Sequence, residues 1–321
     1  MKKMFENKIL LTGASGFIGK SLLLELIKKK MIVRPAYRSG NNIPDIFLDD
    51  AVVVPTLDAA TDWTIALKNV QVVVHAAARA HVMKEKTKNS LAEYRRINVD
   101  GTVNFARQAA KAGVKRFIFI SSIKVNGEST LNGRKFKADD EPSPEDAYGL
   151  SKREAEDELW QIAKETGMEV VVIRPVLVYG PGVKGNFASM QKIVSKGIPL
   201  PFAAITENRR SLVSLDNLLS LIVTCIQHPR AAGHVFLAAD GEDVSTAELI
   251  RRIARAQGKS ARLLWVPVSF MLFAARLLGK GPVVQRLIGS LQVDIEKNRQ
   301  LLGWQPVLNL DEGLYRSQEN V

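Results

Sequence analysis

The sequence predicts an α/β protein in which a doubly wound parallel sheet is followed by a smaller C-terminal lobe. Over the first two-thirds of the chain, short continuous apolar runs alternate with segments of helical period, as is typical of a parallel sheet covered on both faces. After about residue 175 this pattern loosens, and Gly- and Pro-rich segments at 180–182 and 198–201 mark loops. A length of 321 residues suits one large unit and one smaller one.

Each expected strand is a short, mainly apolar run. The expected strands are 9–12, 31–37, 52–55, 70–75, 117–121 and 170–174. The expected helices are 16–30, 63–67, 91–112 and 148–167 between the strands, and 217–227, 245–257 and 268–278 beyond them. Pro35 lies inside the second strand and lacks a backbone N–H, so we expect that strand to be short or bulged there.

A glycine-rich turn joins the first strand to the first helix. Glycines at 13, 16 and 19 permit a tight turn, close approach of the backbone to a pyrophosphate and close packing of helix on strand. The N–H groups at the start of that helix would face the phosphates. We therefore predict a dinucleotide-binding domain of the Rossmann type over residues 1–175. Residues 176–321 should form mainly a substrate-binding lobe, with some segments returning to the sheet. The residues expected to contact the dinucleotide are Gly13, Ser15, Gly16, Phe17, Ile18 and Gly19.

The end of the second expected strand bears on the choice of dinucleotide. An acidic residue there would bind the ribose 2′-hydroxyl of NAD, but the sequence has Arg38 and no acid. Because a guanidinium can pair with a 2′-phosphate, NADP(H) is favoured and NAD(H) remains possible. The alternative for Arg38 is an exposed arginine at a strand end. Asp58, after the third strand, is a candidate for the adenine amino group and equally for a loop cap.

Tyr148 and Lys152 are four residues apart in an expected helix and therefore share a face. A phenol is a poor base near neutral pH, and a neighbouring ammonium together with a positive nicotinamide ring would lower its pKa. Tyr148 could then move a proton to or from a substrate oxygen during hydride transfer. Ser122 follows the fifth expected strand, at the edge of the sheet where ligands bind, and could share that oxygen. We predict Ser122, Tyr148 and Lys152 as the catalytic residues.

These motifs together resemble the NAD-dependent epimerase/dehydratase family, the UDP-glucose 4-epimerase type of extended short-chain dehydrogenase/reductase. The matching features are the glycine turn, the three catalytic candidates and the segments 75–78, 98–102, 174–175, 179–182 and 302–306. The resemblance covers nearly the whole chain. Within the family, the segments 75–80, 121–128 and 183–187 most resemble the bacterial UDP-4-keto-6-deoxy-N-acetylhexosamine 4-reductases of surface-polysaccharide and lipopolysaccharide pathways.

The resemblance implies further binding residues and an assembly. A guanidinium suits the phosphates of a UDP-sugar because it is always charged and can pair bidentately. Helices 91–112 and 148–167 would form the interface of a homodimer. The residues that match binding positions are Ala76, Ala77, Ala78 and Asn98 for the cofactor, and Lys124, Asn186 and Arg210 for the substrate.

Three reactions share this catalytic set. Dehydratases of the family carry an Asp-Glu pair directly after the serine, whereas Ile123 and Lys124 stand here, so dehydration is disfavoured. A 4-epimerase removes hydride from C4 of a UDP-sugar and returns it, usually with tightly bound NAD. A 4-keto reductase performs only the second half and consumes NAD(P)H.

We rank the reductase first, as NAD(P)H-dependent reduction of a UDP-4-keto-6-deoxy-N-acetylhexosamine at C4. Arg38 favours an exchangeable NADP(H), and Leu177 and Asn126 replace the family's Asn and Tyr near the expected sugar pocket. A UDP-glucose or UDP-GlcNAc 4-epimerase is the alternative. A non-catalytic NADP-sensing scaffold is the minor alternative, disfavoured because Tyr148 and Lys152 are both present.

Composition bears on partners and location. The formal net charge is +12, but the basic residues are spread along the chain without interleaved aromatics, so no nucleic-acid partner is expected. Four scattered histidines give no metal-ligand spacing, so no metal is expected. A single cysteine, Cys225, in an apolar run is expected to be a buried core thiol, and the absence of a signal peptide favours the cytoplasm. The apolar stretch 266–278 is too short for stable membrane insertion.

Overall fold

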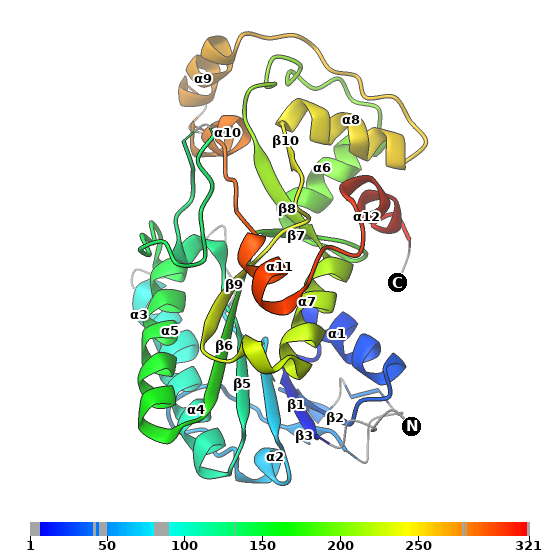
Figure 1. Cartoon of the computed structure of the whole chain (residues 1–321). Helices are drawn as coiled ribbons and strands as arrows, with labels where there is room; N and C mark the ends of the chain where they lie inside the picture. The colour runs from blue at the N-terminus through cyan, green and yellow to red at the C-terminus, as the bar shows by residue number, and fades with distance from the viewer. Residues whose placement is uncertain are drawn as a thin grey trace.

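The computed structural model describes residues 7–40, 43–44, 50–79, 90–131, 133–277, 279 and 281–319. Among them, seven strands form one sheet in the order β3-β2-β1-β4-β5-β6-β9, and every neighbouring pair is parallel (Figure 1). The predicted doubly wound parallel sheet is therefore confirmed. The strands are β1 (Ile9–Thr12), β2 (Val33–Tyr37), β3 (Val52–Val53), β4 (Val72–His75), β5 (Arg116–Ile120), β6 (Glu169–Pro175) and β9 (His234–Ala238).

Helices cover both faces of this sheet (Figure 1). α1 (Phe17–Lys28) and α7 (Leu215–Gln227) pack on one face. The opposite face is covered by α2 (Thr64–Leu67), α4 (Gly101–Lys111) and α5 (Ala147–Thr166). The central strands are consequently buried on both sides, which explains why they read as continuous apolar runs rather than as alternating ones.

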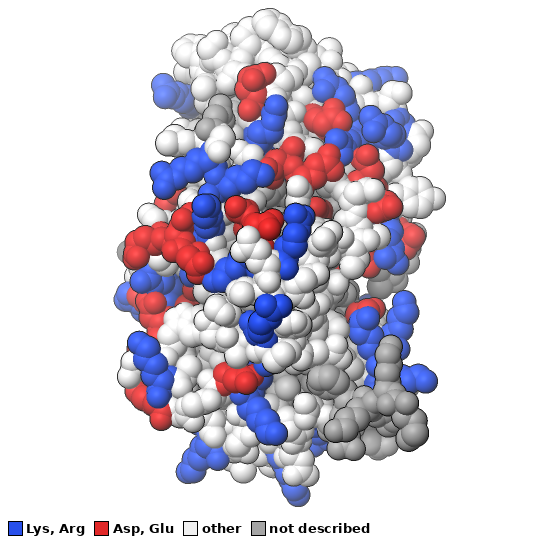
Figure 2. Space-filling model, viewed as in Figure 1, with Lys and Arg blue, Asp and Glu red and all other residues white. Residues whose placement is uncertain are grey.

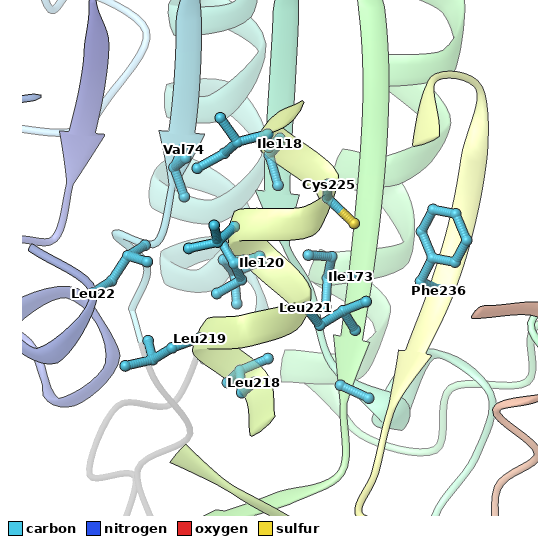
Figure 3. Close-up of a cluster of buried hydrophobic side chains, with 14 of the residues drawn as sticks. Leu22, Val74, Ile118, Ile120, Ile173, Leu218, Leu219, Leu221, Cys225 and Phe236 are labelled. Atoms are coloured by element: carbon cyan, nitrogen blue, oxygen red, sulfur yellow. The ribbon is translucent and has the colours of Figure 1, made fainter. Parts of the chain in front are cut away.

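The α7 side of the sheet carries the larger apolar cluster. Figure 3 shows Leu221 of α7 beside Ile173 of β6, and Leu218 and Ile120 belong to the same buried cluster. Cys225 of the same helix is a free, fully buried thiol, and burial raises its pKa. Its predicted role as a packed core residue is thus confirmed.

Pro35 sits in an unbroken strand, so no bulge is found, but β2 begins only at Val33 and is shorter than the expected 31–37. β2 pairs with β1 along its length, with Leu11 opposite Pro35. The Tyr37 carbonyl accepts a hydrogen bond from the N–H of Val54, so by alternation Pro35 also points toward β3. Because β3 begins its pairing only at Ala36, the missing donor of Pro35 falls where the strand has no ladder partner.

The helix expected over 91–112 is interrupted. It consists of α3 (Ser90–Tyr94), a π-helical segment (Arg95–Asp100) and α4 (Gly101–Lys111). A Cβ on Gly101 would lie 2.8 Å from the Leu57 carbonyl oxygen, so glycine lets this helix approach the segment after β3. A π-helical turn is wider than an α-helical one, so the segment 95–100 rotates the residues before it relative to those after Gly101. Asn98 lies within this π-helical segment.

The C-terminal lobe has its own small sheet, in the order β10-β8-β7 (Figure 1). Its strands are β7 (Leu177–Tyr179), β8 (Arg210–Ser214) and β10 (Asp243–Val244). Apolar residues of α6 (Gly185–Ser195), α8 (Thr246–Ala256) and α12 (Leu310–Arg316) enclose its core. The remaining helices are α9 (Val268–Leu277), α10 (Gly281–Ile288) and α11 (Glu296–Leu302), with 3-10 turns at Ile123–Val125 and Pro229–Ala231. No helix within the described residues is long and apolar enough to cross a membrane.

Candidate active site

The glycine turn packs tightly against the segment that follows β4. Gly13 has a φ of +73°, which favours glycine, and a Cβ there would lie 2.8 Å from the backbone nitrogen of Ala77. A Cβ on Gly19 would overlap the Gly13 carbonyl oxygen. The N-cap residue Gly16 brings no side-chain acceptor to the first N–H groups of α1. The turn therefore presents backbone donors at a helix N-terminus, and this geometry fits a dinucleotide pyrophosphate.

Hydrogen bonds tie the end of β4 to this turn. The Thr12 hydroxyl accepts from the N–H of Ala77 (3.2 Å) and lies 2.7 Å from His75 Nδ1. His75 Nε2 lies 3.1 Å from the Thr102 hydroxyl. Burial and the positive charge of Lys152 lower the pKa of His75 to about 3, so its imidazole is neutral at physiological pH. Ala76, Ala77 and Ala78 are half-buried and run past the glycine turn, where a cofactor channel is predicted.

Asn98 joins that segment to α5. Its Oδ1 accepts from the N–H of Arg79 (2.8 Å), and its Nδ2 donates to the Arg79 carbonyl (3.2 Å) and to the Ser151 hydroxyl (3.1 Å). The Ser151 hydroxyl donates in turn to the carbonyl of Tyr148 (2.8 Å). Asn98 is buried and acts through these groups, so it fixes the backbone after β4 against the start of α5.

Tyr148 lies in the first turn of α5, close to the turn that begins at Ser122. Asp146 caps the helix, because its Oδ1 accepts from the N–H of Gly149 (2.7 Å). A Cβ on Gly149 would lie 2.7 Å from the Lys124 carbonyl oxygen. The glycine after Tyr148 therefore allows α5 to start directly against the 3-10 turn of Ser122, which places both predicted catalytic residues at the same edge of the sheet.

Lys152 is buried one helical turn beyond Tyr148. Its Nζ donates to the carbonyl of Ile120 (2.8 Å) and lies 4.3 Å from the centroid of the Phe119 ring. Burial lowers the pKa of Lys152 to about 7, although the Glu156 carboxylate opposes this shift. The Lys152 ammonium can consequently lose its proton near neutral pH.

The phenol of Tyr148 behaves differently from the prediction. Burial and the negative charge of Asp146 raise its pKa, with a smaller contribution from Tyr94, whose ring lies edge-on at 5.9 Å. The lowering expected from Lys152 is not found in the protein alone. The ammonium gives a hydrogen bond to a backbone carbonyl and is itself easily deprotonated, which explains why it does little for the phenolate.

A buried ion pair lies behind Lys152. Glu156 and Arg174 are both nearly inaccessible, and Arg174 donates from Nε (3.0 Å) and Nη2 (2.5 Å) to the two carboxylate oxygens. The Ser121 hydroxyl donates to the same carboxylate. Sequence reasoning missed Glu156. The available signal was a carboxylate four residues after Lys152 on a helix face that must be buried.

Asn126 belongs to this network. Its Oδ1 accepts from Arg174 Nη1 (2.9 Å) and its Nδ2 donates to the carbonyl of Lys137 (3.1 Å). It is buried at one end of a cavity of about 320 Å³ that Phe136 also lines. Asn126 therefore accepts a hydrogen bond from the buried ion pair and also lines the cavity. Leu177, by contrast, is exposed on β7. These two departures from the family pattern have different structural consequences.

Lys124, a predicted substrate contact, is occupied by acidic partners. Its Nζ donates to Glu128 (2.6 Å) and to Asp146. Arg286 lies 3.8 Å from the other oxygen of Glu128. The role of Lys124 toward a substrate stays a prediction, and it requires the ammonium to leave or share these carboxylates.

The two predicted diphosphate residues lie in the C-terminal lobe. Arg210, at the start of β8, donates to the carbonyls of Arg286 (2.8 Å) and Gly289 (3.1 Å). Burial and the nearby charge of Arg286 lower the pKa of Arg210, so two guanidinium groups share this site. Sequence reasoning missed Arg286, because only the fold brings α10 beside β8. Asn186 is exposed in the first turn of α6, and no described contact joins it to Arg210.

Arg38 directly follows β2 as expected, whereas Asp58 lies in the loop after β3, which already ends at Val53. Arg38 is exposed directly after β2, and the described part of the chain supplies it with no ion-pair partner. Asp58 caps its own loop, since its Oδ1 accepts from the N–H of Ala60 and from the Thr61 hydroxyl, both at 3.0 Å. The loop-cap alternative for Asp58 is thus observed. Among the described residues, no group of His, Cys, Asp or Glu could hold a metal ion.

Comparison with known proteins agrees with this geometry. The sequence profile of the NAD dependent epimerase/dehydratase family matches residues 9–239. The chain is 54% identical to a UDP-glucose 4-epimerase of Vibrio cholerae, over 98% of this chain and 95% of that protein. It is 24% identical to a dTDP-4-dehydro-6-deoxyglucose reductase of Escherichia coli, over 96% of each. The structure resembles a Bacillus cereus UDP-glucuronic acid 4-epimerase solved with NAD, with a TM-score of 0.76, 24% identity and 97% of each chain covered.

The parallel sheet, the glycine turn and the Ser122, Tyr148 and Lys152 set define the class: an NAD(P)-dependent enzyme of the extended short-chain dehydrogenase/reductase type. Within that class, the chain belongs to the NAD-dependent epimerase/dehydratase family.

Proposed function

We propose that the protein is a UDP-sugar 4-epimerase that uses NAD. The observation that carries this proposal is the 54% identity, over nearly the full length of both chains, with a protein named UDP-glucose 4-epimerase. The sequence alone favoured the reductase, and this relative reverses that ranking. The UDP-sugar 4-epimerase was the alternative, and it now accounts better for the whole chain.

The chain's own residues would act as follows. Ser122 and Tyr148, at one edge of the sheet, hold the oxygen on C4 of the sugar, and Tyr148 exchanges its proton with that oxygen. The Lys152 ammonium lies at the same edge of the sheet and would bind the nicotinamide ribose of the cofactor. Arg210 and Asn186 anchor the diphosphate, so that binding energy remote from C4 positions the reacting carbon.

NAD, held by the glycine turn, Ala76 to Ala78 and the Asn98 network, would supply the hydride acceptor and donor. It fits because α1 begins at an uncapped glycine and because the turn closes on Ala77 with no room for a side chain. Its positive ring would also favour the phenolate, which the protein alone disfavours. The NAD assignment is supported by the Bacillus cereus structure solved with NAD.

A second candidate is the C4 reduction of a UDP-4-keto-6-deoxy-N-acetylhexosamine with NADPH. Arg38 supports it, because this exposed guanidinium ends β2 where an NAD-binding acid would stand. Leu177, exposed on β7, supports it as a change from the family pattern near the expected sugar pocket.

We further propose that the enzyme works in the cytoplasm as a homodimer through α3, α4 and α5, which pack together on one side of the sheet.

The two candidates differ in their use of cofactor. Purified protein should convert UDP-glucose or UDP-GlcNAc to the galacto form with no added cofactor or reductant, as resolved by chromatography. Denatured protein should release NAD rather than NADP. Tyr148→Phe protein, carrying the same cofactor, is the matched control and should convert the sugar at least about 100-fold more slowly.

A different outcome of the same assays would favour the reductase. If no galacto sugar forms while the 4-keto sugar oxidises NADPH in a one-to-one ratio, the epimerase proposal fails and the reductase replaces it. Arg38→Ala would then be expected to weaken NADPH binding more than NADH binding.

A further inference from the structure

The far end of the C-terminal lobe carries a cap of exposed apolar side chains that the proposed function does not use. We call it the apolar cap and define it as Leu264 and Trp265 in the loop before α9, and Phe270, Phe273 and Leu277 on α9. Their exposed fractions are 55%, 73%, 61%, 61% and 74%. In Figure 1 this loop and α9 lie at the opposite end of the molecule from α2, and Figure 2 shows an uncharged apex there.

The exposure of the cap follows from how α9 packs. Met271 and Ala275, four residues apart, are the buried residues of α9, and the helix rests on α10. Phe270, Phe273 and Leu277 follow the other face at helical spacing. A helix whose two faces are both apolar needs a second partner, and no described residue of the chain covers the outer face.

The chain around the cap is strongly basic. Residues 249–293 contain eight Lys or Arg and no Asp or Glu, in a protein that has 33 acidic residues in 321. Arg255, Arg262 and Arg276 are exposed, and none of them has an acidic partner within the described residues. Figure 2 shows Lys or Arg on both sides of the uncharged apex, and Asp or Glu only below it. An apolar surface flanked by unneutralised cations is complementary to an anionic lipid bilayer.

We propose that the apolar cap docks the enzyme on an anionic membrane surface, with Trp265, Phe270 and Phe273 inserted at the level of the lipid headgroups. Trp265 suits that depth because its indole is apolar and carries one polar N–H, and the apolar rings of Phe270 and Phe273 suit the boundary between headgroups and acyl chains. A second copy of this chain is the weaker candidate. An isologous contact through the cap would oppose two surfaces that are both cationic, and like charges repel.

Docking there would lie close to the predicted substrate site. α9 packs on α10, and α10 carries Arg286, whose charge acts on Arg210. A bilayer held against α9 therefore lies one helix away from the predicted diphosphate residues. The membrane docking does not rest on the identity of the sugar or on the direction of the reaction.

Flotation with lipid vesicles tests the proposal. The full-length protein should float with phosphatidylcholine vesicles that contain phosphatidylglycerol, float much less with pure phosphatidylcholine, and be released by high salt. Trp265, the most exposed of the described tryptophans, should shift its emission to shorter wavelengths on binding. Phe270→Ser combined with Phe273→Ser should weaken partitioning by about tenfold or more, since two aromatic side chains no longer leave water.

Ile65→Ser is the matched control. Ile65 is 80% exposed on α2, at the opposite end of the molecule, so its substitution should leave flotation unchanged. Both variants alter exposed positions and should keep the wild-type unfolding temperature and the activity without vesicles. The proposal is overturned if the protein floats with neither vesicle, or if Ile65→Ser loses binding as strongly. It is also overturned if the Phe270 and Phe273 substitutions abolish only a concentration-dependent self-association seen by sedimentation.

Discussion

α5 carries Tyr148, Lys152 and Glu156 at intervals of four residues, and burial is the main cause of the pKa shifts of the first two. In the protein alone, burial keeps the phenol of Tyr148 protonated. Burial also lowers the pKa of Lys152, so the ammonium loses its proton more easily. The Glu156 carboxylate, which is ion-paired with Arg174, opposes this lowering of the Lys152 pKa only in part. In the proposed mechanism these residues form a proton-transfer site, and the positive charge of a bound nicotinamide ring would supply the stabilisation of the phenolate that the protein alone lacks.

Tyr148→Phe tests the proton transfer. The substitution removes the hydroxyl and keeps the ring that packs against Tyr94. Turnover should fall by about 100- to 10,000-fold, the usual contribution of general acid–base catalysis. Dinucleotide affinity, followed by titration, should stay within about threefold of wild type. Near-normal turnover would remove Tyr148 from the mechanism.

Lys152→Met tests the cost of burying a cation at the site. The pKa of Lys152 falls from 10.5 to about 7 on folding, so between these values the unfolded chain binds more protons and stability rises with pH. Below about pH 7 the full cost is present, because the folded protein then holds the buried charge. The variant should lose turnover yet unfold at a higher temperature than wild type near pH 7, by roughly 2 °C or more.

The pH dependence separates this cause from a simple packing change. The gain in unfolding temperature should shrink as the pH rises from 7 toward 10.5, since Lys152 then costs progressively less. A gain that is constant with pH would show that titration of Lys152 does not contribute.

At the scale of elements, the glycine turn and α1 form the part of the site most constrained by backbone contact. Gly13 needs its positive φ, and Gly19 needs the space that a side chain would fill. Neither requirement depends on the substrate, so this element should behave as a dinucleotide module whichever sugar is bound.

Gly19→Ala should weaken dinucleotide binding by about tenfold or more and destabilise the fold by about 1–3 kcal/mol. The added methyl overlaps the Gly13 carbonyl, so α1 must move away from the turn. Titration with NAD and denaturant unfolding measure the two effects. Gly281→Ala is the control, because Gly281 also lies in a helix but has open space around its Cβ position. Unchanged affinity in Gly19→Ala would contradict the close approach.

The elements also show what sequence periodicity can and cannot predict. Strands β1, β4, β5 and β6 were predictable because burial on both faces demands continuous apolar runs. β3 has only two paired residues, and no local pattern reveals where pairing stops. The π-helical turn around Asn98 was not predictable either, since its wider hydrogen bonding leaves no clear mark on periodicity. Within this turn Asn98 contacts Arg79 and Ser151, which lie far from it in the sequence.

For the whole molecule, the parts of the site that escaped prediction are those built from distant segments. The glycine turn and the Tyr148–Lys152 spacing are local patterns and could be predicted directly. The Glu156–Arg174 pair joins a helix to the following strand, and Arg286 reaches Arg210 from 76 residues away. Such contacts depend on the tertiary fold, and a single sequence contains no periodic signal for them.

The position of β9 has a consequence for how the protein is made. β9 (His234–Ala238) is the last strand of the sheet, beside β6, and α7 just before it covers one face of the central strands (Figure 3). A nascent chain that has emerged only to residue 175 carries the whole glycine turn and triad, yet β6 still has an unpaired edge and an uncovered apolar face. Synthesis must continue through Ala238 before that edge closes. During this interval the growing chain presents an open strand edge at which edge-to-edge association can occur, and the time that the ribosome takes to reach Ala238 sets how long that edge stays open.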